Sequence, residues 1–207
     1  YKMSDKYNFN IFPLFSDVVT TTTLKCDDKK ILKSLKKLKY VKREGSISKE
    51  VNCLISKNYN VLDSLPILKG EIHKGLTLYI KGLMKQDTRF KITTSWATQT
   101  KPKAYSNSHQ HANSWLSAVY YPEGDENFKI RFHSPKPQLW LDHCNEYNIY
   151  NSKTYDIKAD KNMLIIFPSI LAHEILTNTS KKIRYSLALN VIPQGRIYED
   201  TDSELII

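Results

Sequence analysis

The second half of the chain consists of short β-branched and aromatic runs separated by turn-forming segments, and this pattern constrains the fold more than any other feature. The runs are FKITTSWAT (90–98), WLSAVYY (115–121), FKIRFHS (128–134), MLIIFPS (163–169) and RYSLALNVI (184–192). The gaps between them hold PEGDEN, PKPQ and NTSKK. Many short strands joined by turns are typical of a β-sandwich or a jelly-roll barrel. We therefore predict a jelly-roll core over residues 89–195.

Residues 1–88 carry mainly a helical pattern. Apolar residues recur at helical spacing in segments 25–43 and 63–85, and Pro66 suits the first turn of the second helix. Residues 9–22 favour a short strand. Because helices precede strands, we expect the helices to pack on one face of the barrel as support.

The whole chain, residues 1–207, is long enough for one domain with a sizeable core and short for two. The predicted fold class is therefore mostly β: a double-stranded β-helix, the cupin-like jelly roll, with N-terminal helices on one face. Residues 196–207 are expected to form a C-terminal tail.

The net charge of +10 is concentrated in one segment. Residues 25–43 hold nine Lys or Arg and two Asp, a net of +7, so the remainder carries only +3. Since Ile31, Leu35 and Leu38 mark the buried face of this helix, the lysines fall on a solvated face. Charge alone is a weak signature of nucleic-acid binding, and this distribution does not favour it, although a nucleic-acid partner stays open.

The three cysteines, Cys26, Cys53 and Cys144, are widely spaced and form no CxxC pair. This spacing predicts neither a zinc site nor a disulfide framework, so we expect reduced thiols and a cytoplasmic location. No apolar run approaches the ~20 residues needed to cross a bilayer, and no membrane partner is expected.

Three histidines suggest a metal site. His109 and His111 lie one residue apart just before the run 115–121, and His173 follows the run 163–169. Two ligands close in sequence and one distant histidine are typical of a jelly-roll iron site with open coordination positions. Arg184 comes eleven residues after His173, where its planar fork suits a carboxylate.

At these residues the chain resembles the iron(II)/2-oxoglutarate-dependent oxygenases. Within them it is similar to a group of bacterial and phage proteins with the patterns HxHxxSxLSGVYY, FPSxLxH and RxSxxxN. The matching elements here are His109 and His111 with Ser114 and LSAVYY, then FPSILAH ending at His173, then Arg184, Ser186 and Asn190. The combination of three ordered motifs is more specific than HxH alone.

The resemblance implies one ferrous ion and 2-oxoglutarate as co-substrate, with its distal carboxylate bound by Arg184 and Ser186. Tyr121 is a candidate to line the same pocket. The other implied partners are O2 and a prime substrate that the sequence does not identify. The implied reaction is hydroxylation of that substrate with decarboxylation of 2-oxoglutarate to succinate, in a bacterial cell or a phage-infected host. The implied metal ligands are His109, His111 and His173.

The chain departs from the superfamily's usual His-x-Asp…His triad, because His111 stands where the aspartate is expected. A second register stays open, in which His111 is the first ligand and Asn113 takes the third position. We prefer His109 plus His111, because imidazole binds iron far better than a carboxamide. A halide-binding site, in which the carboxylate is lost, is a further alternative.

Two other functions are kept open. One is a three-histidine, cupin-like metal dioxygenase that does not use 2-oxoglutarate and does not need Arg184 or Ser186. The other is a non-catalytic jelly-roll binding module, in which the three histidines are uncoupled and bind no metal. For Arg184 by itself, the alternative role is that of a structural ion-pair partner of Glu174. His133 is expected at the pocket rim, and the oligomeric state is not encoded in any pattern.

Overall fold

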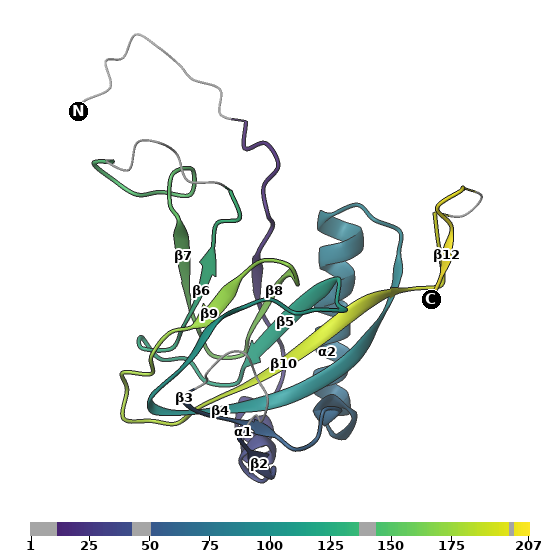
Figure 1. Ribbon diagram of the computed structural model, residues 1–207. Coiled ribbons are helices and arrows are strands. Elements are labelled where there is room, and N and C mark those ends of the chain that lie inside the picture. Colours follow the sequence, from purple (N-terminus) through teal and green to yellow (C-terminus); the bar gives the residue numbers. More distant parts are fainter. Residues whose placement is uncertain (1–11, 43–50, 137–143, 199–200) are drawn as a thin grey trace.

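The longest strand, β4 (Arg89–His109), runs through both halves of a curled antiparallel sheet. It pairs first with β10 (Arg184–Gln194) and β3 (Val51–Ser56), and its last residues pair with β9 (His173–Ile175). Because β4 continues from one group of strands into the other, the sheet curls into a jelly roll. The computed structural model of the protein (Figure 1) describes residues 12–42, 51–136, 144–198 and 201–207.

The main sheet has the order β1-β8-β5-β10-β4-β9-β6-β7, with β3 added to β4 and β2 added to β3. The fold class predicted from the sequence is confirmed: a mostly β jelly roll with few helices. The remaining strands are β1 (Thr20–Thr23), β2 (Tyr40–Val41), β5 (Leu116–Tyr121), β6 (Lys129–His133), β7 (Thr154–Lys158), β8 (Met163–Pro168), β11 (Arg196–Ile197) and β12 (Leu205–Ile206).

Two helices lie on the outer face of the sheet, and α2 runs along it in Figure 1. Helix α1 (Asp28–Lys36) begins after Asp27, whose carboxylate accepts a hydrogen bond of 3.0 Å from the Lys30 amide. Such a cap satisfies one of the amides left open at a helix start. Helix α2 (Pro66–Thr77) has proline in its first turn, as predicted, and continues as a π-helical segment, Leu78–Leu83.

Strand β5 separates two hydrophobic cores. Alternate side chains of a strand point to opposite faces, and both faces of β5 are buried. Leu116, Ala118 and Tyr120 pack with the helices in the outer core, whereas Val119 and Tyr121 face the barrel interior. The interior core also contains Phe128, Ile130, Phe132, Ile165 and Phe167. The barrel interior is therefore filled largely by apolar side chains, and the polar residues within it are candidates for a site.

The N-terminal part contains more β-structure than its pattern predicts. Helix α1 ends at Lys36, and Tyr40–Val41 forms β2 instead of continuing the helix to residue 43. The short strand was expected within residues 9–22, of which 9–11 lie outside the described residues; in the described part it corresponds to β1, Thr20–Thr23. The predicted tail contains a small antiparallel pair, β11 and β12, that closes through backbone bonds between Gly195 and Ile207.

Among the described residues, no helix combines the length and the apolar character that a membrane span requires.

Candidate metal centre

Two of the three histidines meet through strand pairing. His109 is the last residue of β4 and His173 is the first residue of β9, and the two are partners in the antiparallel ladder. His111 lies two residues beyond the end of β4, where its backbone N–H donates to the carbonyl of Ser169 at 3.0 Å. The fold thus brings together the histidines that the sequence singles out.

The three imidazoles form a compact group. One ring nitrogen from each lies within 4.8 Å of the others. The ring centroids are 4.5 Å apart for His109 and His173, 5.1 Å for His111 and His173, and 5.4 Å for His109 and His111. No carboxylate belongs to this group within the described part of the chain. The donor set is therefore three neutral nitrogens, which suits iron and other first-row divalent metals.

Hydrogen bonds fix the tautomers of the first and third histidines. Nδ1 of His109 is 2.8 Å from the carbonyl oxygen of Asn107, and Nδ1 of His173 is 2.9 Å from that of Leu171. A carbonyl oxygen can only accept, so each Nδ1 carries the proton and each Nε2 carries the lone pair. A hydrogen bond from the ring nitrogen that does not bind the metal is the usual way in which a protein orients a metal-binding imidazole.

The surroundings of His173 keep it neutral. Burial, followed by the neighbouring His109, lowers the pKa of His173 to about 3. Aromatic side chains provide this low-polarity wall: the ring centroids of Phe167 and Phe132 lie 4.7 and 6.0 Å from that of His173. Because a histidine must be deprotonated to bind metal, His173 is in the ligand-ready state across the physiological pH range.

Arg184 is a buried cation without a carboxylate partner in the described structure. It is the first residue of β10 and is 1% exposed. Its guanidinium lies 5.5 Å from the centre of the Phe128 ring, Nη1 donates to the Lys129 carbonyl at 3.5 Å, and Nη2 has no hydrogen-bond partner. A buried charge left unpaired costs several kcal/mol, so this position is suited to an anionic ligand.

Tyr121 and Ser186 complete the polar interior next to Arg184. The Tyr121 hydroxyl is buried and also lacks a hydrogen-bond partner among the described residues. Burial raises the pKa of Tyr121, and the nearby positive charge of Arg184 lowers it in part. Ser186 follows Arg184 by two residues on the same face of β10 and is 7% exposed. Two orphaned donors and a hydroxyl thus form a set that fits a carboxylate.

Other residues considered in the sequence lie elsewhere. Asn113 sits in an exposed turn with φ +54° and is not part of the histidine group. Glu174 does not serve as the ion-pair partner of Arg184 that the sequence left open. Its carboxylate lies 3.3 Å from Nε2 of His133 and 4.0 Å from Nη1 of Arg131.

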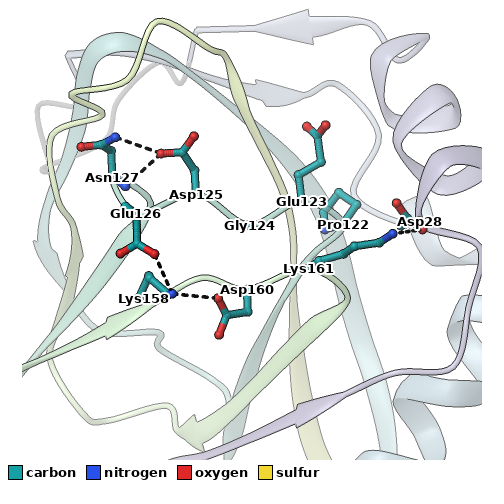
Figure 2. Close-up of a pocket in the computed structure, with 10 residues that line it drawn as sticks. All are labelled: Asp28, Pro122, Glu123, Gly124, Asp125, Glu126, Asn127, Lys158, Asp160 and Lys161. Atoms are coloured by element: carbon teal, nitrogen blue, oxygen red, sulfur yellow. Dashed lines mark hydrogen bonds and ion pairs between the residues drawn. The ribbon is translucent and has the colours of Figure 1, made fainter.

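A cavity of about 690 Å³ lies at the opposite end of β5 and β8 from the histidines. Figure 2 shows that it is lined by the two turns before β6 and β8 and by Asp28. Three of its carboxylates are paired with lysines of the same cavity: Lys161 is 3.2 Å from Asp28, and Lys158 is 2.9 Å from Glu126 and 3.2 Å from Asp160. This cavity is separate from the candidate metal centre.

The contacts of His111 with two neighbouring side chains were not predicted from the sequence. Trp96 on β4 has its ring centroid 5.6 Å from that of His111, and Asn190 on β10 has its side-chain oxygen 2.7 Å from His111 Nδ1. Asn190 was noticeable only as the last residue of the RxSxxxN pattern. Its contact depends on how β10 and β5 pair, which a single sequence does not display.

The fold is a jelly roll whose interior contains three clustered histidines and a buried arginine. Residues 94–190 match the family described as "Putative 2OG-Fe(II) oxygenase". The matched segment contains the three histidines and Arg184, and the match supports an oxygenase that uses Fe(II) and the co-substrate 2-oxoglutarate. The enzyme class predicted from the sequence is therefore confirmed. No curated protein sequence matches the chain.

Solved structures share this fold at low sequence identity. A 2OG-Fe(II) oxygenase family protein from Burkholderia pseudomallei has a TM-score of 0.57 at 10% identity, covering 79% of this chain and 76% of its own. HygX from Streptomyces hygroscopicus, bound to nickel, 2-oxoglutarate and hygromycin B, has a TM-score of 0.60 at 8% identity, covering 86% and 83%. A Trichoplax adhaerens prolyl hydroxylase has 0.59 at 10%, covering 84% and 83%.

Proposed function

We propose that this oxygenase binds one Fe(II) ion through His109, His111 and His173 and binds the distal carboxylate of 2-oxoglutarate at Arg184. The observation that carries this assignment is the combination of a three-imidazole group and a buried, unpaired guanidinium in one barrel interior. Without a ligand, the buried guanidinium lowers the stability of the fold. Together, the imidazole group and the guanidinium match Fe(II) and 2-oxoglutarate, the cofactors of the matched family.

The chain's own residues have distinct tasks in this arrangement. The three imidazoles hold the metal on one side and leave the remaining coordination positions open to 2-oxoglutarate and O2. Arg184 neutralises the distal carboxylate, and the hydroxyls of Tyr121 and Ser186 supply hydrogen bonds to it. Phe132 and Phe167 exclude water from the back of the site. The bound iron and co-substrate supply the oxidising chemistry, for which we propose hydroxylation of the prime substrate.

The proposal is tested by anaerobic titration of the metal-free protein with Fe(II) and then with 2-oxoglutarate. The chelate of the two has a weak visible charge-transfer band, and we expect this band to appear with wild-type protein and to saturate at equal amounts of 2-oxoglutarate and protein. Fe(II) binding without the band would contradict the co-substrate assignment.

One observation favours a second candidate, a three-histidine metal dioxygenase that does not use 2-oxoglutarate. The histidine group contains no carboxylate within the described residues, whereas the usual non-haem iron triad does. The two functions differ in whether O2 uptake depends on 2-oxoglutarate and yields succinate. Arg184 argues against the second candidate, because an enzyme without 2-oxoglutarate has no use for a buried unpaired cation.

The location follows from the same chemistry. Cys26 and Cys144 form no disulfide in the described structure, and ferrous iron persists best where thiols stay reduced. We therefore propose the cytoplasm as the place of action.

A further inference from the structure

His111 is held differently from the other two histidines. His109 and His173 each donate from Nδ1 to a backbone carbonyl two residues earlier in the chain. Nδ1 of His111 instead contacts two side chains, Asn190 Oδ1 at 2.7 Å and Ser117 Oγ at 2.9 Å. Because His111 lies beyond the end of β4, its orientation depends on these side chains.

The sheet register brings the two partners together. Asn190 of β10 is the Cα partner of Ser117 of β5, and Ser117 Oγ lies 3.2 Å from Asn190 Oδ1. The pairing of β10 with β4 shifts directly after Asn190, between it and Val191. Such irregularities re-aim side chains and are common near functional sites. Asn190 is therefore directed at His111 by the local structure of β10.

The hydrogen-bond directions make His111 the donor. Ser169 Oγ donates to Ser114 Oγ at 2.8 Å, and Ser114 Oγ donates to the Leu116 carbonyl at 2.9 Å. The single proton of Ser117 Oγ goes to Asn190 Oδ1 at 3.2 Å or to Ser169 Oγ at 2.8 Å, and in both cases a lone pair of Ser117 faces His111. With the amide oxygen of Asn190 also an acceptor, the proton between these groups sits on Nδ1.

We propose that Asn190, supported by Ser117, is a positioning residue that fixes His111 as the Nδ1–H tautomer and makes Nε2 the metal-binding nitrogen. A carboxylate at this corner has no tautomers and can bind through either oxygen, whereas an imidazole with the wrong proton or a flipped ring presents no lone pair. A histidine in place of the usual carboxylate therefore requires a hydrogen-bond acceptor that keeps its proton on Nδ1, and Asn190 provides this acceptor. This inference rests on the proposed function, because it takes His111 as a ligand.

The test uses Co(II) as the probe metal, added to the metal-free protein. Nuclear magnetic resonance of the Co(II) protein is expected to show three exchangeable, strongly shifted signals, one for each Nδ1–H of a ligand histidine. Asn190→Leu removes the acceptor. We expect it to weaken Co(II) binding 10–100-fold, the usual effect of losing such a partner, and to displace or abolish one signal while leaving two in place.

Asn190→Asp serves as the conservative variant, because it keeps an acceptor of the same shape. It is expected to retain Co(II) affinity and to shift the same single signal, since a carboxylate accepts more strongly. Ser117→Ala is expected to move that signal with a smaller loss of affinity. Thr93→Val is the matched control: the Thr93 hydroxyl donates to the backbone carbonyl of Asn190 at 3.3 Å and does not touch the amide. It should behave as wild type.

The outcomes separate this inference from the proposed function. If the wild-type protein fails to bind Co(II), or shows fewer than three signals, the assignment of the three histidine ligands is wrong, and the proposed function is contradicted with it. Three wild-type signals that stay unchanged in Asn190→Leu and Asn190→Asp overturn the role of Asn190 alone. If Asn190→Leu does not fold, Asn190→Asp and Ser117→Ala decide: a selective shift of one signal supports the inference, and unchanged spectra contradict it.

Discussion

His109 and His173 are paired across the β4–β9 ladder, with ring centroids 4.5 Å apart. Directly paired residues of an antiparallel sheet project to the same face, so backbone pairing alone brings these imidazoles together. His111 has no ladder partner of this kind and is held by the side chains of Asn190 and Ser117. The candidate site thus combines two positions set by the sheet with one set by side-chain contacts.

Removal of His173 should abolish most Fe(II) binding. His173→Ala takes away one of only three proposed protein ligands, and its position at the start of β9 allows the backbone pairing to persist. Metal analysis after anaerobic reconstitution should find one iron per wild-type chain and far less in the variant. His73→Ala is the control, because His73 stacks on Phe90 and is not part of the group. Equal iron in all three proteins would remove His173 from the ligand set.

Removal of Arg184 should affect the co-substrate and spare the metal. Arg184→Ala is expected to retain iron and to weaken 2-oxoglutarate binding by ~2–5 kcal/mol, as for other desolvated charge pairs. Arg184→Lys should recover only part, because the bidentate fork is lost. Calorimetry measures the 2-oxoglutarate affinity of the two variants. The control is Arg131→Ala, which breaks a surface ion pair with Asp156 at 2.6 Å. Unaltered 2-oxoglutarate affinity in Arg184→Ala would show that the carboxylate binds elsewhere.

The neighbouring tyrosines of β5 form a matched pair. Tyr121→Phe removes a buried hydroxyl without a partner, so we expect no loss of stability for the ligand-free protein and about 1 kcal/mol weaker 2-oxoglutarate binding. Tyr120 points to the other face, where its hydroxyl donates to Asn162 Oδ1 at 2.5 Å. Tyr120→Phe should lose about 1 kcal/mol of stability and keep its 2-oxoglutarate affinity. Urea unfolding and calorimetry compare the two variants, and the reverse pattern would contradict the role of Tyr121.

Local patterns predicted the strands that bury side chains on a regular alternation. Strands β5, β8 and β10 lie within the predicted runs or within two residues of them. The three-residue β9 was not predicted, because it is too short to show a period and exists only through pairing with β4 and β6. Strand β2 lies in the lysine-rich segment that was predicted to be helical. It forms a strand because its pairing with β3 overrides the helical pattern.

The candidate site was predictable to the level of residue types in ordered motifs. His109, His111, His173 and Arg184 were singled out because histidine and arginine have specific chemistry at recognisable spacing. The contact between Asn190 and His111 was not predictable, because it depends on the register that pairs Asn190 with Ser117. A single sequence determines such a register only through tertiary packing.

Acid should destabilise the metal-free protein through His173. Its folded-state pKa is about 3, below the unfolded value of about 6.5, so the unfolded chain binds the extra proton between these values. The free energy of unfolding therefore falls as the pH drops below 6.5, by as much as about 2 kcal/mol at pH 5. Urea unfolding in the presence of a chelator should show this slope in wild type and a flatter one in His173→Ala. Identical slopes would mean that His173 is not buried in the neutral form.

The last prediction concerns which residues form the HxH pair. With His109 and His111 as ligands, His111→Ala should open a coordination position and lose much of the iron affinity. His111→Asp restores the carboxylate of the usual triad, so iron should stay bound at a site one unit less positive. Asn113→Asp should change little, since Asn113 lies in an exposed turn outside the group.

The alternative register, with His111 and residue 113 as ligands, makes the opposite forecast. It requires His109→Ala to be mild and Asn113→Asp to tighten iron binding, because a carboxylate would then replace a weakly coordinating amide. Fe(II) affinity and 2-oxoglutarate turnover measured for the four variants separate the two. The ladder pairing of His109 with His173 favours a strong loss in His109→Ala. Full iron binding in that variant, together with tighter binding in Asn113→Asp, would move the first ligand to His111.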